Sequence, residues 1–134
     1  MNKFPRQPYP SELRFELLLA ASEPPPLQHK SIETAFFAGQ QQQGGPSGIE
    51  TVLILQAAVV TLGPAEGEFS SRRAWLATGH FGRNPPPTKD ARWQFLEQLG
   101  LAIGNQLLRT YPNNVFALTI RCDGEVGSAV FAEE

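Results

Sequence analysis

Alternating apolar and polar positions predict β-strands in four stretches of the chain. Residues 13–19 carry leucine or phenylalanine at every second position, which is the period of a half-buried strand, with a short helix as the alternative. Residues 32–37 gather β-branched and aromatic side chains and predict a second short strand. Residues 49–62 are apolar on both alternating faces, which predicts a central strand covered on each side. Residues 72–81 alternate around Trp75 and predict a fourth strand.

Helical spacing of apolar residues appears between Thr88 and Pro112. The positions that recur at this spacing are Trp93, Leu96, Leu99, Ile103 and Leu107. Thr88 is a suitable N-cap and Pro112 ends the run, so we expect one long helix here. Gly100 and Gly104 lie four residues apart on one side of this helix. Because each glycine weakens a helix, they predict a close approach of the helix to a sheet.

A β-hairpin is predicted at the C-terminal end of the chain. Residues 115–122 and 125–131 are both rich in strand-forming side chains, and they flank Asp123-Gly124. This dipeptide is a strong signal for a two-residue turn. Pairing Cys122 with Glu125 places Phe116, Leu118 and Ile120 beside Phe131, Ala129 and Gly127 on one face. We expect the long helix to pack on that face.

The elements in chain order are ββββαββ, which predicts an α+β fold. The expected architecture is a mainly antiparallel sheet of about six strands with one long helix packed across a face. Residues 1–10 hold three prolines without a period and are expected to form an extended arm. Residues 11–134 then form a single domain, in which the Gln- and Gly-rich residues 39–48 are interpreted as a flexible loop.

Composition narrows the class of protein. The chain has 134 residues, and its longest apolar stretch, residues 52–62, is shorter than the roughly twenty residues of a bilayer span. We therefore expect no membrane association. Cys122 is the single cysteine, and a lone thiol suits a reducing compartment, so a cytoplasmic location is expected.

Motifs that would indicate catalysis or a cofactor are missing from the sequence. The two histidines lie 51 residues apart, and there is no HExxH, CxxC, EF-hand, GxSxG or Walker-type pattern. We therefore assign no catalytic residue, no metal site and no cofactor. Cys122 is interpreted as a buried packing residue rather than a nucleophile, because free cysteine usually packs as a small hydrophobe.

Basic residues are concentrated between positions 71 and 92. This segment has five basic residues and one aspartate, a local charge of +4 in a chain whose net charge is −2. The segment joins a predicted strand to the N-terminus of the long helix, where free N–H groups and the helix dipole favour anions. We expect an anion or an acidic protein partner to bind here. The candidate binding residues are Arg72, Arg73, His80, Arg83, Lys89 and Arg92.

Three other interpretations of the same segment stay open. The arginines are also compatible with a solvated surface that keeps the protein in solution. A small enzyme or ligand-binding protein would use a pocket between helix and sheet, with His80 as acid or base and nearby arginines holding an anionic substrate. A nucleic-acid binder would stack bases on Trp75, Phe81 and Trp93, although the net negative charge argues against it.

Apolar residues outside the expected core suggest self-association. Leu101 and Leu108 fall off the main stripe of the long helix, and Val126 and Val130 lie on the second face of the hairpin. Only 18% of residues are charged, so a further buried interface is expected at these four positions. The alternative is that the first two strands cover this face within the monomer. Our interpretation is a non-catalytic interaction or assembly protein that forms homo-oligomers and engages a partner or anionic group through the basic segment.

Overall fold

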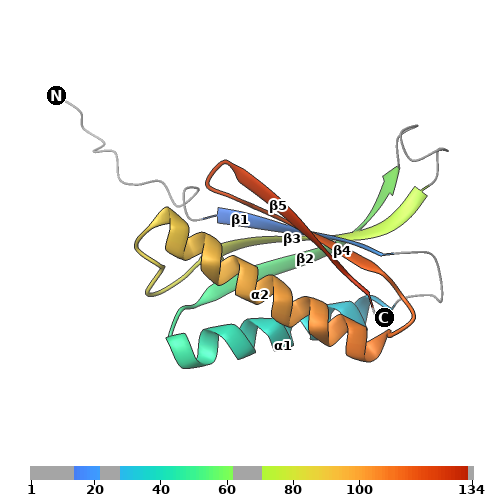
Figure 1. Cartoon of the computed structure of the whole chain (residues 1–134), viewed down its shortest axis with the longest axis horizontal. Coiled ribbons are helices and arrows are strands. Elements are labelled where there is room, and N and C mark those ends of the chain that lie inside the picture. The colour runs from blue at the N-terminus through green and yellow to red at the C-terminus, as the bar shows by residue number, and fades with distance from the viewer. Residues whose placement is uncertain (1–13, 22–27, 62–70, 133–134) are drawn as a thin grey trace.

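The computed structural model describes residues 14–21, 28–61 and 71–132, so the expected arm at residues 1–10 lies outside the described residues. Two helices and five strands make up this part of the chain (Figure 1). Their bounds are β1 Arg14–Ala21, α1 His29–Ser47, β2 Thr51–Thr61, β3 Ser71–Phe81, α2 Lys89–Thr110, β4 Phe116–Cys122 and β5 Glu125–Phe131. The fold is α+β, as the sequence predicts.

The five strands form one antiparallel sheet in the order β2-β3-β1-β4-β5. In the order βαββαβ, each helix connects two parallel strands that have a third, antiparallel strand between them. This is the split βαβ arrangement of ferredoxin-like folds. Here β5 adds a fifth strand beside β4. Both helices lie side by side on the same face of the sheet (Figure 1).

The C-terminal hairpin has the predicted register. Cys122 pairs with Glu125 and Phe116 pairs with Phe131. Asp123 and Gly124 have φ values of 54° and 79°, so both turn residues adopt the left-handed conformation of a type I′ turn. The local sequence therefore predicts this hairpin correctly.

The long helix forms as α2, and its predicted N-cap and packing face are confirmed. The Thr88 side chain accepts a hydrogen bond from the backbone N–H of Ala91 at 3.0 Å. The predicted stripe is buried from Leu96 to Leu107. A Cβ atom on Gly104 would overlap the ring of Phe131, and one on Gly100 would lie 3.1 Å from the Leu118 side chain. The two glycines thus allow the close approach of helix to sheet that their spacing indicates.

Helix α1 replaces two predicted elements, a strand at residues 32–37 and a flexible loop at residues 39–48. Both predictions are wrong. The buried positions Ile32, Ala35, Phe36 and Gly39 have helical rather than alternating spacing. A Cβ on Gly39 would lie 2.7 Å from the Ile103 side chain, so this glycine is where α1 meets α2. Glutamine is a good helix former, and the helix ends where Gly48 turns left-handed at φ 71°.

The strand predicted at residues 49–62 forms as β2, but it is not a central strand. β2 is at one edge of the sheet, and Val52 and Ile54 point to the face without helices, with 46% and 62% of their surface exposed. In the described part of the chain the sheet thus has five strands instead of about six, and two helices pack on it instead of one. The first strand forms as β1 and pairs with β3 and β4, so it does not fold over the hairpin.

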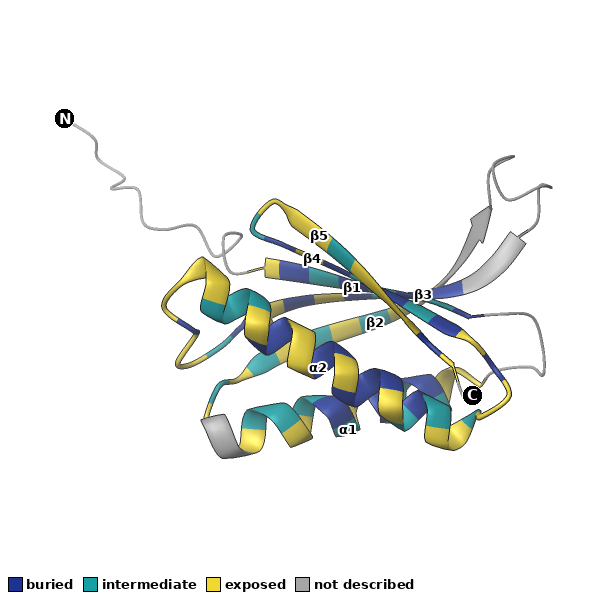
Figure 2. Ribbon diagram, in the orientation of Figure 1, coloured by how far each residue is buried: buried dark blue, intermediate teal, exposed yellow. Residues whose placement is uncertain are grey.

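The hydrophobic core lies between the sheet and the two helices (Figure 2). Phe15, Leu17 and Leu19 on β1 and the alternate residues of β3 and β4 point into it. No element among the described residues covers the opposite face of the sheet. In the same part of the chain, neither helix is long and apolar enough to cross a lipid bilayer.

Candidate functional site: the β5 edge and the α2–β5 groove

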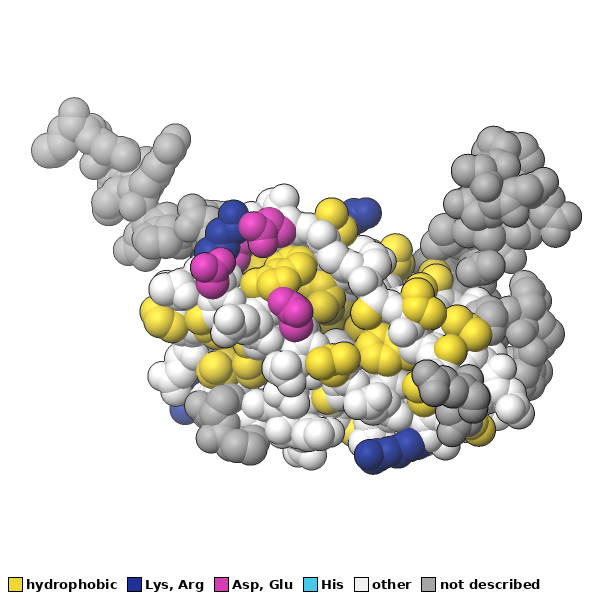
Figure 3. All heavy atoms as spheres, in the orientation of Figure 1, with side chains coloured by type: hydrophobic (Ala, Val, Ile, Leu, Met, Phe, Trp, Pro, Cys, Tyr) yellow, Lys and Arg dark blue, Asp and Glu magenta, His cyan; other side chains and the backbone are white. Residues whose placement is uncertain are grey.

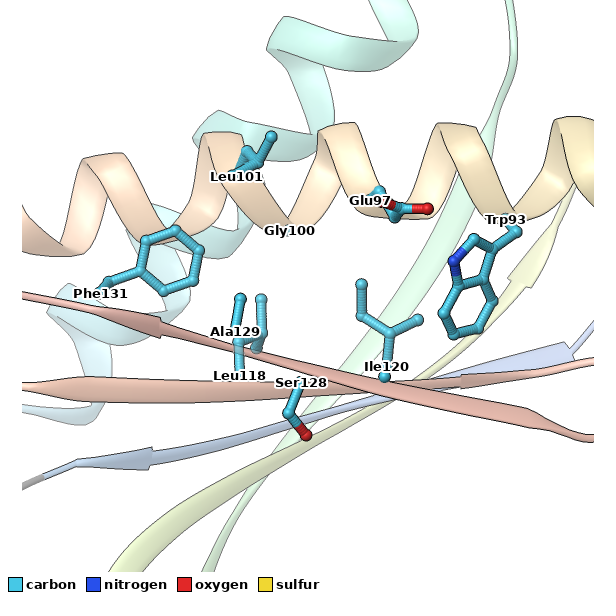
Figure 4. A pocket seen from close by; sticks show the side chains of 10 residues that line it. Trp93, Glu97, Gly100, Leu101, Leu118, Ile120, Ser128, Ala129 and Phe131 are labelled. Atoms are coloured by element: carbon cyan, nitrogen blue, oxygen red, sulfur yellow. The ribbon is translucent and has the colours of Figure 1, made fainter.

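An apolar groove of about 240 Å³ separates α2 from β5 (Figure 4). Its walls come from α2, β4 and β5, namely Trp93, Glu97, Gly100, Leu101, Leu118, Ile120, Gly127, Ser128, Ala129 and Phe131. Trp93 and Phe131 stand at its two ends, with Leu118 and Ile120 between them (Figure 4). On the surface, hydrophobic side chains gather where α2 meets β5 (Figure 3). Among the described residues that line the groove, Glu97 is the one with a charge.

The groove exists because β5 carries small residues opposite the helix. Gly127 and Ala129 are the β5 positions that face α2 between Glu125 and Phe131. The Trp93 ring packs on Gly127, where a Cβ atom would lie 2.9 Å from Cζ2 of the indole. Larger residues at these two positions would fill the groove, so the small residues of β5 keep it open.

β5 is an edge strand, and its outer backbone groups follow from the hairpin geometry. In a two-residue hairpin the residues that flank the turn exchange both backbone hydrogen bonds, and the pairs then alternate. Cys122 and Glu125 flank the turn, so the N–H and C=O groups of Val126, Ser128 and Val130 point away from β4. Thr119 and Ser128 form a pair without backbone bonds, in which the side chains lie closer. Their hydroxyl oxygens are 2.9 Å apart.

β5 itself carries none of the usual devices that protect the edge of a sheet. It contains no proline, lysine or arginine, and its pairing with β4 is continuous from Phe131 to Glu125. The other edge of the sheet differs. Backbone bonds of Glu50 go to Gly82 and Arg83, so the Thr51 carbonyl faces outward, where the side chain of Gln40 donates to it. At its described start β2 is therefore capped by α1, whereas among the described residues only β4 pairs with β5.

Three of the four predicted interface residues lie around this edge. Val126 and Val130 are 64% and 69% exposed on the face without helices, and Leu101 is 45% exposed on the rim of the groove. Leu108 differs because it is partly buried and packs against the core. The structure thus brings Leu101, Val126 and Val130 to one edge of the molecule and leaves Leu108 out of it.

The predicted basic segment is arranged around acidic side chains from other elements. The guanidinium of Arg83 pairs with Glu50, and Lys89 Nζ lies 3.6 Å from Glu125 Oε1. Arg92 Nε lies 3.0 Å from Asp123 Oδ2, and both side chains are about 15% exposed. The local excess of positive charge along the sequence is therefore balanced in space for the cations that the structure describes.

The pKa values reflect these pairs. The hydrogen bond from Arg83 lowers the pKa of Glu50, and the same bond raises the pKa of Arg83. Partial burial opposes ionisation of Asp123, but hydrogen bonds from Arg92 and Cys122 outweigh it and lower the pKa of Asp123. An anion at this junction would have to displace these carboxylates. Anion binding by the basic segment stays a prediction.

The other predicted site residues are not gathered into a pocket. His80 is exposed on β3, where it alternates with the core residues Gly79 and Phe81 and so faces away from the helices. Its Nδ1 lies 3.3 Å from the carbonyl of Phe81. The pocket between helix and sheet is lined by other residues, so the enzyme expected to use His80 there has no support in this geometry. Arg72 and Arg73 belong to β3, but their side chains lie outside the described residues.

Two further expectations concern aromatic rings and the cysteine. Trp75 and Phe81 are 2% and 4% exposed in the core, so neither ring is accessible for stacking with a base. Burial, followed by the hydrogen bond to Asp123, raises the pKa of Cys122 to about 12. A thiol with this pKa is protonated at neutral pH, as expected for a packing residue. Within the described ranges, no three His, Cys, Asp or Glu residues lie close enough to hold a metal ion.

Comparisons with known proteins add one finding about the fold. No family model and no curated protein matches the sequence. Among solved structures, the chain is similar to a phage SAM lyase in the apo state, with 9% identity, 98% of each chain covered and a TM-score of 0.51. A phage SAM lyase in complex with S-methyl-5′-thioadenosine has 12% identity, 91% and 92% coverage and a TM-score of 0.46. At this identity, the first likeness establishes that the two proteins share a fold over nearly their whole length.

Proposed function

We propose that this chain is a non-catalytic assembly protein that self-associates through the β5 edge and the adjoining α2–β5 groove. The observation that carries the proposal is that β5, which no other described strand covers, lies beside exposed Leu101, Val126 and Val130. Natural sheets usually blunt their edges with charge, proline or bulges, so an open apolar edge indicates a pairing site.

In the monomer, apolar side chains of β5 are exposed to water. Fully burying a valine or leucine side chain contributes about 1.5–3 kcal/mol. Val126 and Val130 each expose about two thirds of their surface. Outer N–H and C=O groups of β5 also exchange water for protein partners when a strand pairs there. By contrast, the described cations of the basic segment already have carboxylate partners, so that segment contributes less to the proposal.

Light scattering coupled to size-exclusion chromatography tests the proposal on the full chain. We expect a mass above that of the 14.7 kDa monomer at micromolar concentration. Val130→Lys should lower that mass, because it places a charge in the interface. The matched control is Val52→Lys, an exposed valine on β2 at the opposite edge of the sheet. A mass of one chain for the parent across the concentration range would refute self-association.

A second candidate function is binding of a small cationic ligand in the same groove. The specific observation is the flat indole of Trp93 at one end of the groove, with the carboxylate of Glu97 on the rim. Because the chain shares a fold with a phage SAM lyase, S-adenosylmethionine is the ligand to test first. Its adenine offers a stacking surface for the indole, and its sulfonium offers a positive charge for the carboxylate.

Calorimetry with S-adenosylmethionine tests this second candidate. Binding should weaken at least tenfold in Trp93→Ala and several-fold in Glu97→Gln. Glu33→Gln is the matched control, because Glu33 is a carboxylate of α1 that does not line the groove. If millimolar S-adenosylmethionine gives no heat of binding, this second function is refuted. If all three variants bind with equal affinity, the ligand binds outside the groove.

A further inference from the structure

The partner at the β5 edge follows from the sequence of the strand itself. Residues 126–130 read Val-Gly-Ser-Ala-Val, which is nearly palindromic about Ser128. Large residues stand at both ends, small residues come next, and a hydroxyl lies in the middle. Resting on the self-association proposed above, we infer that β5 pairs with β5 of a second copy, antiparallel, around a two-fold axis at Ser128. Two five-stranded sheets then join into one sheet of ten strands.

The backbone supports this register. The residues whose N–H and C=O groups point outward are Val126, Ser128 and Val130, which follow from the two-residue turn. In an antiparallel pair centred on Ser128, Ser128 faces its own counterpart and Val126 faces Val130 of the partner subunit. All outward groups of these three residues then form bonds across the joint. If the register is shifted, at least one of these three residues has no partner within β5 of the second copy whose N–H and C=O groups also point outward.

The side chains match in the same register. On the face without helices, each valine meets a valine and the two serine hydroxyls meet at the axis. No two charges of the same sign face each other, because Glu125 lies opposite Phe131 of the partner subunit. Isologous contacts of this kind close after two copies, so the expected assembly is a dimer. Cross-strand pairs of β-branched residues are among the stabilising pairs in sheets.

The helix side of the joint gives a second, independent argument. The groove between α2 and β5 opens toward the edge of the sheet, and half-exposed Leu101 stands on its rim. Joining two sheets at β5 places a second α2 on the other side of the axis. Leu101 of each copy then lies above the joint, beside the small residues Gly127 and Ala129. The dimer therefore covers the α2–β5 groove. Of the three described pockets, this is the one with walls from β5.

Disulfide cross-linking tests the register. In Ser128→Cys the two new thiols would face each other at the spacing of paired strands, within the roughly 4.4–6.8 Å between Cα atoms that a disulfide spans. We expect a covalent dimer on mild oxidation. In Val126→Cys or Val130→Cys alone, the symmetric thiols would be about four residues apart along the strand, so they should not cross-link. A mixture of these two variants should cross-link, because position 126 faces position 130.

The parent chain is the control for adventitious oxidation, because its cysteine is buried with a pKa of about 12. A second variant, Ser128→Pro, removes an outward N–H but no backbone bond to β4. It also removes the exposed hydroxyl that pairs with Thr119, which Ser128→Ala removes alone. Ser128→Pro should therefore give the monomer mass, and both variants should keep the circular dichroism of the parent.

The outcomes separate the two proposals. If the parent is oligomeric but Ser128→Cys does not cross-link, or if Val126→Cys alone cross-links as well as Ser128→Cys, the β5 register is wrong while self-association stands. If Ser128→Pro keeps the oligomer mass, the joint is likewise elsewhere. If the parent itself is monomeric, the proposed function fails and this inference fails with it.

Discussion

Arg92 in the first turns of α2 and Asp123 in the β4–β5 turn form an ion pair, with Nε 3.0 Å from Oδ2. Arg92 Nη1 also donates to the carbonyl of Pro86 at 3.2 Å. The pair therefore joins the start of the helix, the loop before it and the tip of the hairpin. Locally, Arg92 is a cation near the start of the helix and Asp123 shapes the turn. Their ion pair adds a tertiary contact between these two elements.

Removing this pair should destabilise the fold and change its acid sensitivity. Asp123→Asn keeps a residue that tolerates the positive φ of the turn, and we expect it to cost about 1–3 kcal/mol of unfolding free energy at pH 7. The pKa of Asp123 is lowered in the folded state, so the folded protein binds fewer protons there than the unfolded chain. Its contribution is present above the unfolded pKa of about 4 and is lost as the pH falls through the lowered value.

Urea denaturation between pH 7 and pH 3 measures this effect. The stability of the parent should fall more steeply below about pH 4 than that of Asp123→Asn, because the variant has no carboxyl to protonate at this position. Curves that run parallel through the whole range would show that the pair makes no such contribution.

Two glycines should respond oppositely to alanine. Gly104→Ala places a methyl group into the Phe131 ring, and the resulting strain of about 1–3 kcal/mol outweighs the gain of about 1 kcal/mol in helix propensity. Gly45→Ala in α1 meets nothing within 4 Å, so it should stabilise by up to about 1 kcal/mol. Thermal melts of the two variants measure the contrast. Equal shifts in Tm would mean that α2 does not approach β5 as closely as described.

The two histidines should differ in their effect on stability. His29 Nδ1 accepts a hydrogen bond from Trp75 Nε1 at 3.2 Å, which ties the start of α1 to β3. His29→Ala should cost about 1–2 kcal/mol, because it leaves the indole N–H of a buried tryptophan without this partner. His80→Ala on the exposed face is the matched control and should change stability by less than about 0.5 kcal/mol. Guanidinium denaturation measures both, and a larger loss in His80→Ala would contradict the assignment.

Deleting the four glutamines, residues 40–43, should destabilise the protein strongly. A flexible loop would tolerate the deletion, because closure entropy depends only weakly on length. In the structure the deletion removes about one turn of α1 and the bonds from Gln40 to Thr51. We expect a loss of about 2 kcal/mol or more in a thermal melt. The control replaces exposed Gln41 and Gln42 by alanine, which keeps the helix and should be nearly neutral; an unchanged melt after the deletion would restore the loop interpretation.

Local sequence signals were sufficient for the C-terminal half of the fold. Asp123-Gly124 specifies its turn because both residues tolerate positive φ, and Thr88 with the apolar stripe specifies α2. The sequence predicts a strand and a loop in place of helix α1 because Ile32, Ala35 and Phe36 are too few apolar positions to distinguish the two periods. Glutamines and glycines after them resemble a linker. The signal for a helix is the helical spacing of the apolar residues, which continues to Gly39. Gly39 fits this pattern only because it contacts Ile103 in α2.

Only the tertiary structure decided the arrangement of the sheet and the surroundings of the charges. Strand order depends on which long-range pairs form, and nothing local to residues 51–61 distinguishes an edge strand from a central one. The basic residues were visible in the sequence, but Glu50, Glu125 and Asp123 reach them from distant elements. The candidate interface was partly predictable, because Val126 and Val130 alternate with the core face of β5. That β5 is the last described strand of the sheet and lies beside a groove depends on long-range pairing and on the packing of α2 against Gly127, which no single segment encodes.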